Sequence, residues 1–261
     1  MASGDLHIVG QLSGASNVAI VGIVDGLWVI YKPIRGEQPL WDFPTGTLAG
    51  REYAAYLVAM ATGYAAVPPT VVREGPLGVG TVQLWIGSPL DSPDTASSDL
   101  SSPVALAPVG EVPSGWLHVV DGHLPDGAEV SVLHEDRDDM RDVAVLDAIT
   151  NQADRKGSHL VRDGAGRLWG FDHGLTFNTE PKLRTVLWGW AGKALRQRDL
   201  DVLTVLESRL TDEADDLTRD LREVLPSADV AALLGRVADL LRTGRHPRPS
   251  RHWPSIPWPA I

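Results

Sequence analysis

The sequence contains no cysteine, and this absence excludes several kinds of site. A chain without cysteine has no disulfide, no thiolate ligand for zinc, no iron–sulfur cluster and no thiol nucleophile. Its most apolar early stretch, residues 18–31, is interrupted by Asp25 and by glycines, and the N-terminus lacks the basic and apolar segments of a secretion signal. These features predict a soluble cytoplasmic protein without integral membrane association.

Positive charge is also scarce. The 261 residues include 23 Lys and Arg against 34 Asp and Glu, a net charge of −11 with His counted as neutral. Nucleic acids and anionic lipid surfaces are bound mainly through an excess of basic residues, so neither is expected as the main partner. A hydrophobic content of 43% is sufficient for the core of one large domain or of two small lobes.

Three common motifs of catalysis and binding are missing. The phosphate-binding sequence G-x-x-x-x-G-K-[ST] and the nucleophile sequence G-x-S-x-G do not occur. His118, His123 and His134 lie in an irregular section, and no two of them have the i, i+4 spacing of helical zinc ligands. A P-loop nucleotide site, a serine hydrolase and a zinc enzyme are therefore not expected.

The first 86 residues predict a small β-rich unit. Two apolar runs flank Asp25 and Gly26, a dipeptide typical of a tight hairpin turn. A helix with its end at Gly63 follows, and then two further strands. The expected order is β-β-α-β-β, at residues 18–24, 27–32, 47–62, 71–75 and 78–86.

The rest of the chain predicts a linker and then a larger, mainly helical unit. Residues 87–108 are dominated by Ser, Pro, Asp and small side chains, which bury too little apolar surface to offset ordering entropy. We therefore expect a linker or insertion there, a lobe over residues 109–245 and an irregular tail over residues 246–261. Within the lobe, hydrophobic periodicity predicts a helix over residues 137–149, a hairpin over 159–172 and helices over 194–242.

The densest polar cluster lies between the predicted helix and hairpin, in residues 151–160. Asp154 and Asp172 occupy the two flanks of one short hairpin, so their carboxylates can converge on one point. Mg²⁺ takes oxygen ligands and often combines one or two carboxylates with substrate phosphates. The pair therefore favours nucleotide chemistry.

These residues carry a resemblance to a known family. The sequence DRKGSH at residues 154–159, the hairpin, and DHG at residues 172–174 resemble the catalytic loop and metal-binding segment of the protein-kinase-like superfamily. The steps of five and thirteen positions between Asp154, His159 and Asp172 match the superfamily spacing. Among its members, the chain is most similar to the phosphatidylinositol 3/4-kinase-like proteins of high-GC bacteria.

The resemblance implies an α+β, two-lobed protein-kinase-like fold with a small β-rich N-lobe and a mainly helical C-lobe. It implies ATP and Mg²⁺ as cofactors, with Lys32 binding the phosphates and Glu52 orienting Lys32. The loop before the first predicted strand resembles a phosphate-covering loop, and the end of the N-lobe resembles the adenine-binding hinge. The implied nucleotide-binding residues are Ser16, Asn17, Lys32, Glu52, Gln83 and Trp85.

The resemblance also assigns chemical roles in the C-lobe. Asp154 accepts the proton of the acceptor hydroxyl, Lys156 offsets charge on the transferred phosphoryl group, and Asp172 carries the metal ion. His159 occupies the position of a metal-binding Asn, and imidazole suits borderline metals better than Mg²⁺, which leaves a second metal ion in doubt.

The residues leave the acceptor and the reaction open. The net charge and the lack of a basic surface run favour a small molecule or protein acceptor over a lipid. His159 makes a nucleotide-binding pseudokinase the alternative to a phosphotransferase, and AMP transfer from a reversed nucleotide is a third possibility.

Overall fold

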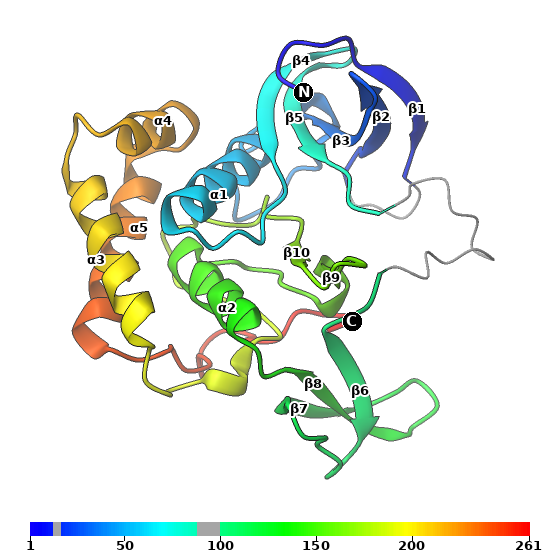
Figure 1. The fold of residues 1–261 in the computed structure, drawn as a ribbon, viewed down its shortest axis with the longest axis vertical. Coiled ribbons are helices and arrows are strands. Elements are labelled where there is room, and N and C mark those ends of the chain that lie inside the picture. The colour runs from blue at the N-terminus through cyan, green and yellow to red at the C-terminus, as the bar shows by residue number, and fades with distance from the viewer. Residues whose placement is uncertain (13–16, 88–99) are drawn as a thin grey trace.

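The computed structural model describes residues 1–12, 17–87 and 100–261 of the chain. Two lobes are visible in Figure 1, a β-rich N-terminal lobe and a larger C-terminal lobe that is mainly helical. This α+β architecture, with a β-rich first lobe and a mainly helical second lobe, is the one that the sequence predicted. The N-terminal lobe contains β1 (His7–Gln11), β2 (Ile20–Val24), β3 (Leu27–Pro33), α1 (Leu48–Thr62), β4 (Thr70–Gly75) and β5 (Gly78–Leu84).

The N-terminal sheet has the strand order β1-β2-β3-β5-β4, and every neighbouring pair is antiparallel. Asp25 (φ 51°) and Gly26 (φ 78°) both adopt left-handed conformations between β2 and β3, the geometry of the hairpin turn that this dipeptide favours. The predicted hairpin is confirmed. Strand β1 was not predicted, because all its residues are exposed and it shows no burial alternation.

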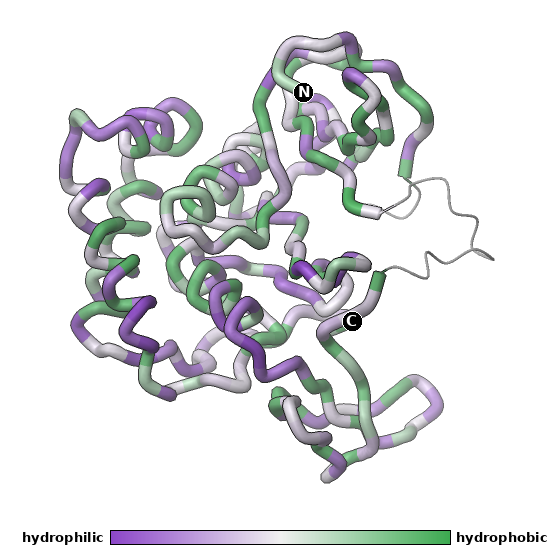
Figure 2. Tube along the Cα trace, viewed as in Figure 1, coloured by the Kyte–Doolittle hydropathy of each residue, from purple (hydrophilic) through white to green (hydrophobic). Residues whose placement is uncertain are grey.

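The two faces of this sheet have different environments. Residues alternate between the faces of a strand, so Ile30 and Lys32 of β3 share one face. On that face Ile30 lies opposite Val21 of β2, and both pack with Ala19 and Trp85 in a small apolar cluster. The sheet thus presents an apolar surface beside a lysine. In Figure 2 green stretches alternate with white and purple ones along the N-terminal strands, whereas the turn between α3 and α4 is mostly purple.

Helix α1 links the two lobes. Its buried face is formed by Ala54, Ala55 and Val58, which join the main core of the C-terminal lobe. Gly50 faces the end of α4, where a Cβ atom would lie 2.5 Å from the carbonyl oxygen of Val224, so the close contact between the helices requires glycine. Helix α1 ends at Gly63 (φ 69°), as predicted.

The C-terminal lobe contains the predicted helix and hairpin, followed by three further helices. None of the helices in the described part of the chain is both long and apolar enough to cross a bilayer. The elements are β6 (Val104–Pro108), β7 (Trp116–His123), β8 (Glu129–Glu135), α2 (Asp138–Thr150), β9 (Leu160–Arg162), β10 (Leu168–Gly170), α3 (Gln197–Thr211), α4 (Asp216–Val224) and α5 (Ser227–Thr243).

The expectation of a linker over residues 87–108 needs correction at its C-terminal end. Residues 104–108 form β6, which pairs with β8 in a three-stranded sheet of order β6-β8-β7. Pairing buries Val104 against the core, and this tertiary contact outweighs the weak strand preference of the Ala- and Pro-rich segment. Residues 88–99 lie outside the described residues. The tail, residues 246–261, is fully described and contains no helix or strand.

Candidate active site

Lys32 lies at the centre of a charged cluster between the lobes. Its Nζ donates to Glu52 Oε2 at 3.0 Å and to Asp172 Oδ1 at 3.1 Å. Strand β3, helix α1 and the segment after β10 each supply one of these side chains. Burial lowers the pKa of Lys32, but the two carboxylates more than offset this and hold its pKa above the usual value, so the amine is a cation. The structure thus brings together three residues predicted from separate parts of the chain.

Asp172 is held in an uncommon conformation and stays open to solvent. Its φ of 57° lies in the left-handed region, where few residues other than Gly, Asn and Asp occur, and its side chain is 56% exposed. Its second oxygen, Oδ2, lies 3.7 Å from His159 Nε2. The charge of Lys32 holds the pKa of Asp172 well below its usual range, although burial opposes this shift. Asp172 therefore presents an anionic oxygen toward the space between the lobes.

Glu52 connects helix α1 to the loop that carries Asp172. While Oε2 accepts from Lys32, Oε1 accepts from the backbone N–H of His173 at 3.2 Å. The Glu52 side chain is only 4% exposed, so both bonds are shielded from water. The Glu52 carboxylate thus positions both Lys32 and His173, the residue that follows Asp172.

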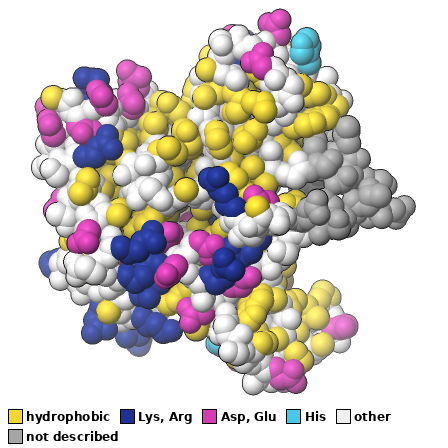
Figure 3. Space-filling model, in the orientation of Figure 1, with side chains coloured by type: hydrophobic (Ala, Val, Ile, Leu, Met, Phe, Trp, Pro, Cys, Tyr) yellow, Lys and Arg dark blue, Asp and Glu magenta, His cyan; other side chains and the backbone are white. Residues whose placement is uncertain are grey.

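Asp154 and Lys156 lie on the loop between α2 and β9, and they form an ion pair. Lys156 Nζ lies 3.0 Å from Asp154 Oδ2, and an Arg184 nitrogen lies 3.9 Å from Asp154 Oδ1. The three side chains are each between 21% and 26% exposed. Figure 3 shows basic and acidic side chains intermixed where the lobes meet. Two cations beside one carboxylate are suited to a substrate that brings several negative charges.

Arg155, to which the sequence assigned no role, is fully buried beneath the site. Its guanidinium forms an ion pair with buried Asp147, donates to the carbonyl of Phe171 at 2.7 Å and contacts His173 Nε2 at 2.8 Å. Because arginine only donates, His173 Nε2 is an acceptor and the ring is neutral. Burial, together with the charge of Arg155, holds the pKa of His173 well below its ordinary value. Arg155 therefore fixes both neighbours of Asp172.

The remaining predicted nucleotide-binding residues lie in the N-terminal lobe. Gln83 is buried in β5, where its amide donates to Thr70 Oγ1 at 2.8 Å. The backbone N–H of Trp85 donates to Trp28 O, and its indole N–H is buried without a partner among the described residues. Asn17 Oδ1 accepts from the backbone N–H of Gln38 at 2.7 Å. None of these three side chains forms a hydrogen bond or ion pair with Lys32, Glu52 or Asp172, and Ser16 lies outside the described residues.

The cluster fits a cation that completes its coordination with phosphate oxygens. Within residues 1–12, 17–87 and 100–261, no group of three His, Asp or Glu side chains converges as metal ligands. Asp172 nevertheless offers an exposed carboxylate with a lowered pKa, which suits Mg²⁺. Burial lowers the pKa of His159 and so keeps its imidazole neutral, but an imidazole nitrogen suits borderline metals better than Mg²⁺. The donor set fits one cation better than two.

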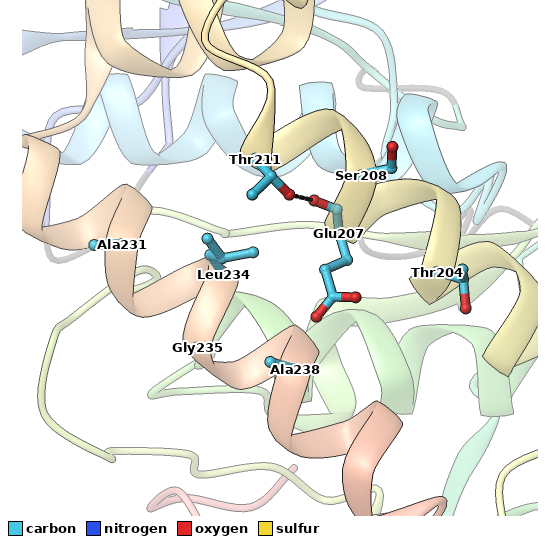
Figure 4. A pocket seen from close by; sticks show the side chains of 8 residues that line it. All are labelled: Thr204, Glu207, Ser208, Thr211, Ala231, Leu234, Gly235 and Ala238. Carbon is cyan, nitrogen blue, oxygen red and sulfur yellow. Dashed lines mark hydrogen bonds between the residues drawn. The ribbon is translucent and has the colours of Figure 1, made fainter.

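Two cavities lie away from the Lys32 cluster. One of about 650 Å³ lies between α3 and α5; α3 contributes Thr and Ser hydroxyls and Glu207, and α5 contributes small and apolar residues (Figure 4). The other, of about 430 Å³, is lined by residues of the segment before α1, Arg51 of α1, the segment after β10 and the start of α5. Lys182 and Asp42 in this second cavity are paired at 2.8 Å, as are Arg51 and Asp229 at 2.6 Å. Both cavities are separate from the residues predicted to act on a nucleotide.

The chain is similar to known proteins. No family model matches the chain. Among solved structures, the chain is similar to the proinflammatory kinase CtkA of Helicobacter pylori, with 11% identity, a TM-score of 0.44 and coverage of 94% of this chain and 93% of that chain. Among curated proteins, it is 41% identical over 268 residues to Protein Rv2133c of Mycobacterium tuberculosis (strain ATCC 25618 / H37Rv), an alignment that spans 100% of this chain and 94% of the relative. The chain therefore belongs to the same family as Protein Rv2133c.

Proposed function

We propose that the protein is an ATP- and Mg²⁺-dependent phosphotransferase of the phosphatidylinositol 3/4-kinase-like type. The observation that carries the proposal is the position of Lys32, which contacts Glu52 and Asp172 at once. These residues are 20 and 140 positions from Lys32 in the chain. An ordinary surface lysine does not need two such distant carboxylates as partners. A cation fixed between a buried carboxylate and an exposed one is suited to hold phosphates that approach from the exposed side.

The N-terminal lobe offers a surface for the nucleobase beside this lysine. Ile30 lies two positions before Lys32 on the same face of β3, and it packs with Val21 and Trp85. A planar base packs favourably on apolar and aromatic side chains. We therefore assign the base to this surface and the α- and β-phosphates to Lys32.

The C-terminal lobe supplies the groups for transfer. Asp154 accepts the proton of the acceptor hydroxyl, and Lys156 neutralises charge that develops on the transferred group. Asp172 holds the cation, which when bound supplies charge neutralisation for the phosphates. Arg155 keeps Asp172 in place through Phe171. Most of the rate enhancement in this scheme comes from positioning and electrostatics.

The acceptor that we propose is a small molecule or a protein in the cytoplasm. With a net charge of −11, the chain has little general attraction to anionic membranes or nucleic acids. The second candidate function, nucleotide binding without transfer, is favoured by one observation. His159, in the position of a metal-binding Asn, lies 3.7 Å from Asp172, and its imidazole nitrogen is a poor ligand for a second Mg²⁺.

The test is the substitution Asp172→Asn. Asn tolerates the left-handed region as well as Asp does, so the variant keeps its fold while it loses the charge. ADP release from ATP and Mg²⁺ is measured with a panel of small hydroxyl compounds and with dialysed cell extract, beside the matched surface variant Asp201→Asn. We expect D172N to lose transfer by orders of magnitude and D201N to retain it. Near-normal transfer in D172N contradicts the proposal, and tight ATP binding without transfer in the wild type favours the second candidate.

A further inference from the structure

The side chain of Gln152 lies between the two aspartates assigned to catalysis. It is fully buried, at the start of the loop between α2 and β9, which lies beside the end of β10 at the centre of Figure 1. Its Nε2 donates to the backbone carbonyl of Asp172 at 3.2 Å, and its Oε1 accepts from the backbone N–H of Asp154 at 3.1 Å. One amide thus joins residues 18 positions apart.

The backbone of Gln152 is itself fixed at both ends. Its N–H donates to the carbonyl of Asp147, one turn back in α2, at 2.9 Å. Its carbonyl accepts from the N–H of Arg184 at 2.9 Å. The side chain therefore extends from a rigid base, and its two bonds transmit that rigidity to both aspartates.

The chemistry of the two contacts requires an amide. The backbone N–H of Asp154 can only donate, and the carbonyl of Asp172 can only accept, so the residue between them needs one acceptor and one donor at its tip. Among side chains of this length, Gln has both groups, ionised Glu lacks the donor and Met lacks both. This pattern also fixes which end of the amide faces which aspartate.

We propose that Gln152 is a positioning residue that sets the distance and orientation between the proton-accepting Asp154 and the cation-holding Asp172. The inference rests on the proposed phosphotransferase function. Gln152 does not contact the Lys32–Glu52 pair, so it acts on the geometry of transfer more than on nucleotide binding. We refer to its two side-chain bonds as the Gln152 bridge.

Two substitutions separate the bridge from a general packing role. Gln152→Met fills the same space and removes both bonds, and a displacement of about 1 Å at a reacting group can cost ~100-fold in rate. We therefore expect a loss of kcat of about that size in Q152M, with KM for ATP near the wild-type value. The matched control is Gln197→Glu on the exposed surface of α3, which is expected to leave both constants unchanged.

Gln152→Glu separates the two bonds of the bridge. Its carboxylate keeps the acceptor for the Asp154 N–H and lacks the donor to the Asp172 carbonyl. We therefore expect kcat of Q152E to lie between those of the wild type and Q152M, with KM for ATP near the wild-type value.

The outcomes are distinct. Full kcat in Q152M, or a loss in Q152M that appears only as a higher KM for ATP, overturns the bridge. Absence of transfer in the wild type refutes the proposed function instead, and hydrogen exchange at the Asp154 amide then decides whether the bridge exists. We expect this amide to be protected in the wild type and in Q152E and to exchange faster in Q152M, whereas equal exchange in Q152M contradicts the bridge.

Discussion

Replacing Glu52 with Gln tests the electrostatic centre of the site. Glu52 accepts from Lys32 through one oxygen and from the His173 N–H through the other. An amide in its place has only one acceptor oxygen, so its NH₂ group faces either Lys32 or the His173 N–H, and two donors then meet. One bond is lost, and the bond that remains is no longer made by a charged acceptor. Lys32 then pairs more strongly with Asp172, the residue whose carboxylate holds the cation in the proposed mechanism.

The expected magnitude follows from the bonds concerned. Hydrogen bonds to charged groups contribute about 1.5–3 kcal/mol and neutral ones about 0.5–1.5 kcal/mol. The difference is about 1–1.5 kcal/mol, which corresponds to a loss of roughly tenfold in affinity for ATP. Because Lys32 itself is 26% exposed, solvent screening keeps the effect near this value rather than above it.

Isothermal titration of ATP with Mg²⁺ measures this loss. The matched control is Glu223→Gln on the exposed face of α4, which changes the net charge equally and is expected to bind ATP as the wild type does. The double variant with Lys32→Met adds a further check, since residues that act through one contact are not additive. Wild-type affinity in E52Q, or additive losses in the double variant, refutes the reasoning.

Two further predictions concern stability. Gly50→Ala is expected to lower the free energy of unfolding by about 1–2 kcal/mol in urea titration, because overlap with the Val224 carbonyl outweighs the better helix propensity of Ala; an unchanged midpoint contradicts the packing. Burial lowers the pKa of His134 from 6.5 to about 4, so the unfolded chain binds more protons in this interval and stability falls by about 3 kcal/mol as the pH falls from 6.5 to 4. Urea titrations across this interval are expected to show a shallower slope in His134→Gln, and an equal slope contradicts the assignment.

Local patterns in the sequence predict much of the fold and part of the site. The turn at Asp25 and Gly26 depends on two residues that tolerate positive φ, and the helix that ends at Gly63 depends on local periodicity. Both are encoded within a few neighbouring positions, and both are present. The convergence of Lys32, Glu52 and Asp172 was implied by the resemblance to the protein-kinase-like superfamily.

Features that depend on distant partners were not predicted. Strand β6 forms because Val104 is buried beside residues far along the chain, and its own composition favours a linker. In the sequence, nothing distinguishes Arg155 and Gln152 from ordinary polar loop residues. Their roles arise from contacts to Phe171 and Asp172, which no local pattern specifies.

A reactive analogue of ATP tests the central claim, that Lys32 holds the phosphates of a nucleotide. An acyl-phosphate ester of ATP acylates lysine amines beside the bound phosphates, and the chain has four lysines, at positions 32, 156, 182 and 193. Mass spectrometry of the digested protein is predicted to find Lys32 acylated, with labelling suppressed by excess ATP, while exposed Lys193 is unaffected by ATP. Labelling of Lys32 that ATP does not suppress, or no labelling of Lys32 at all, contradicts the account.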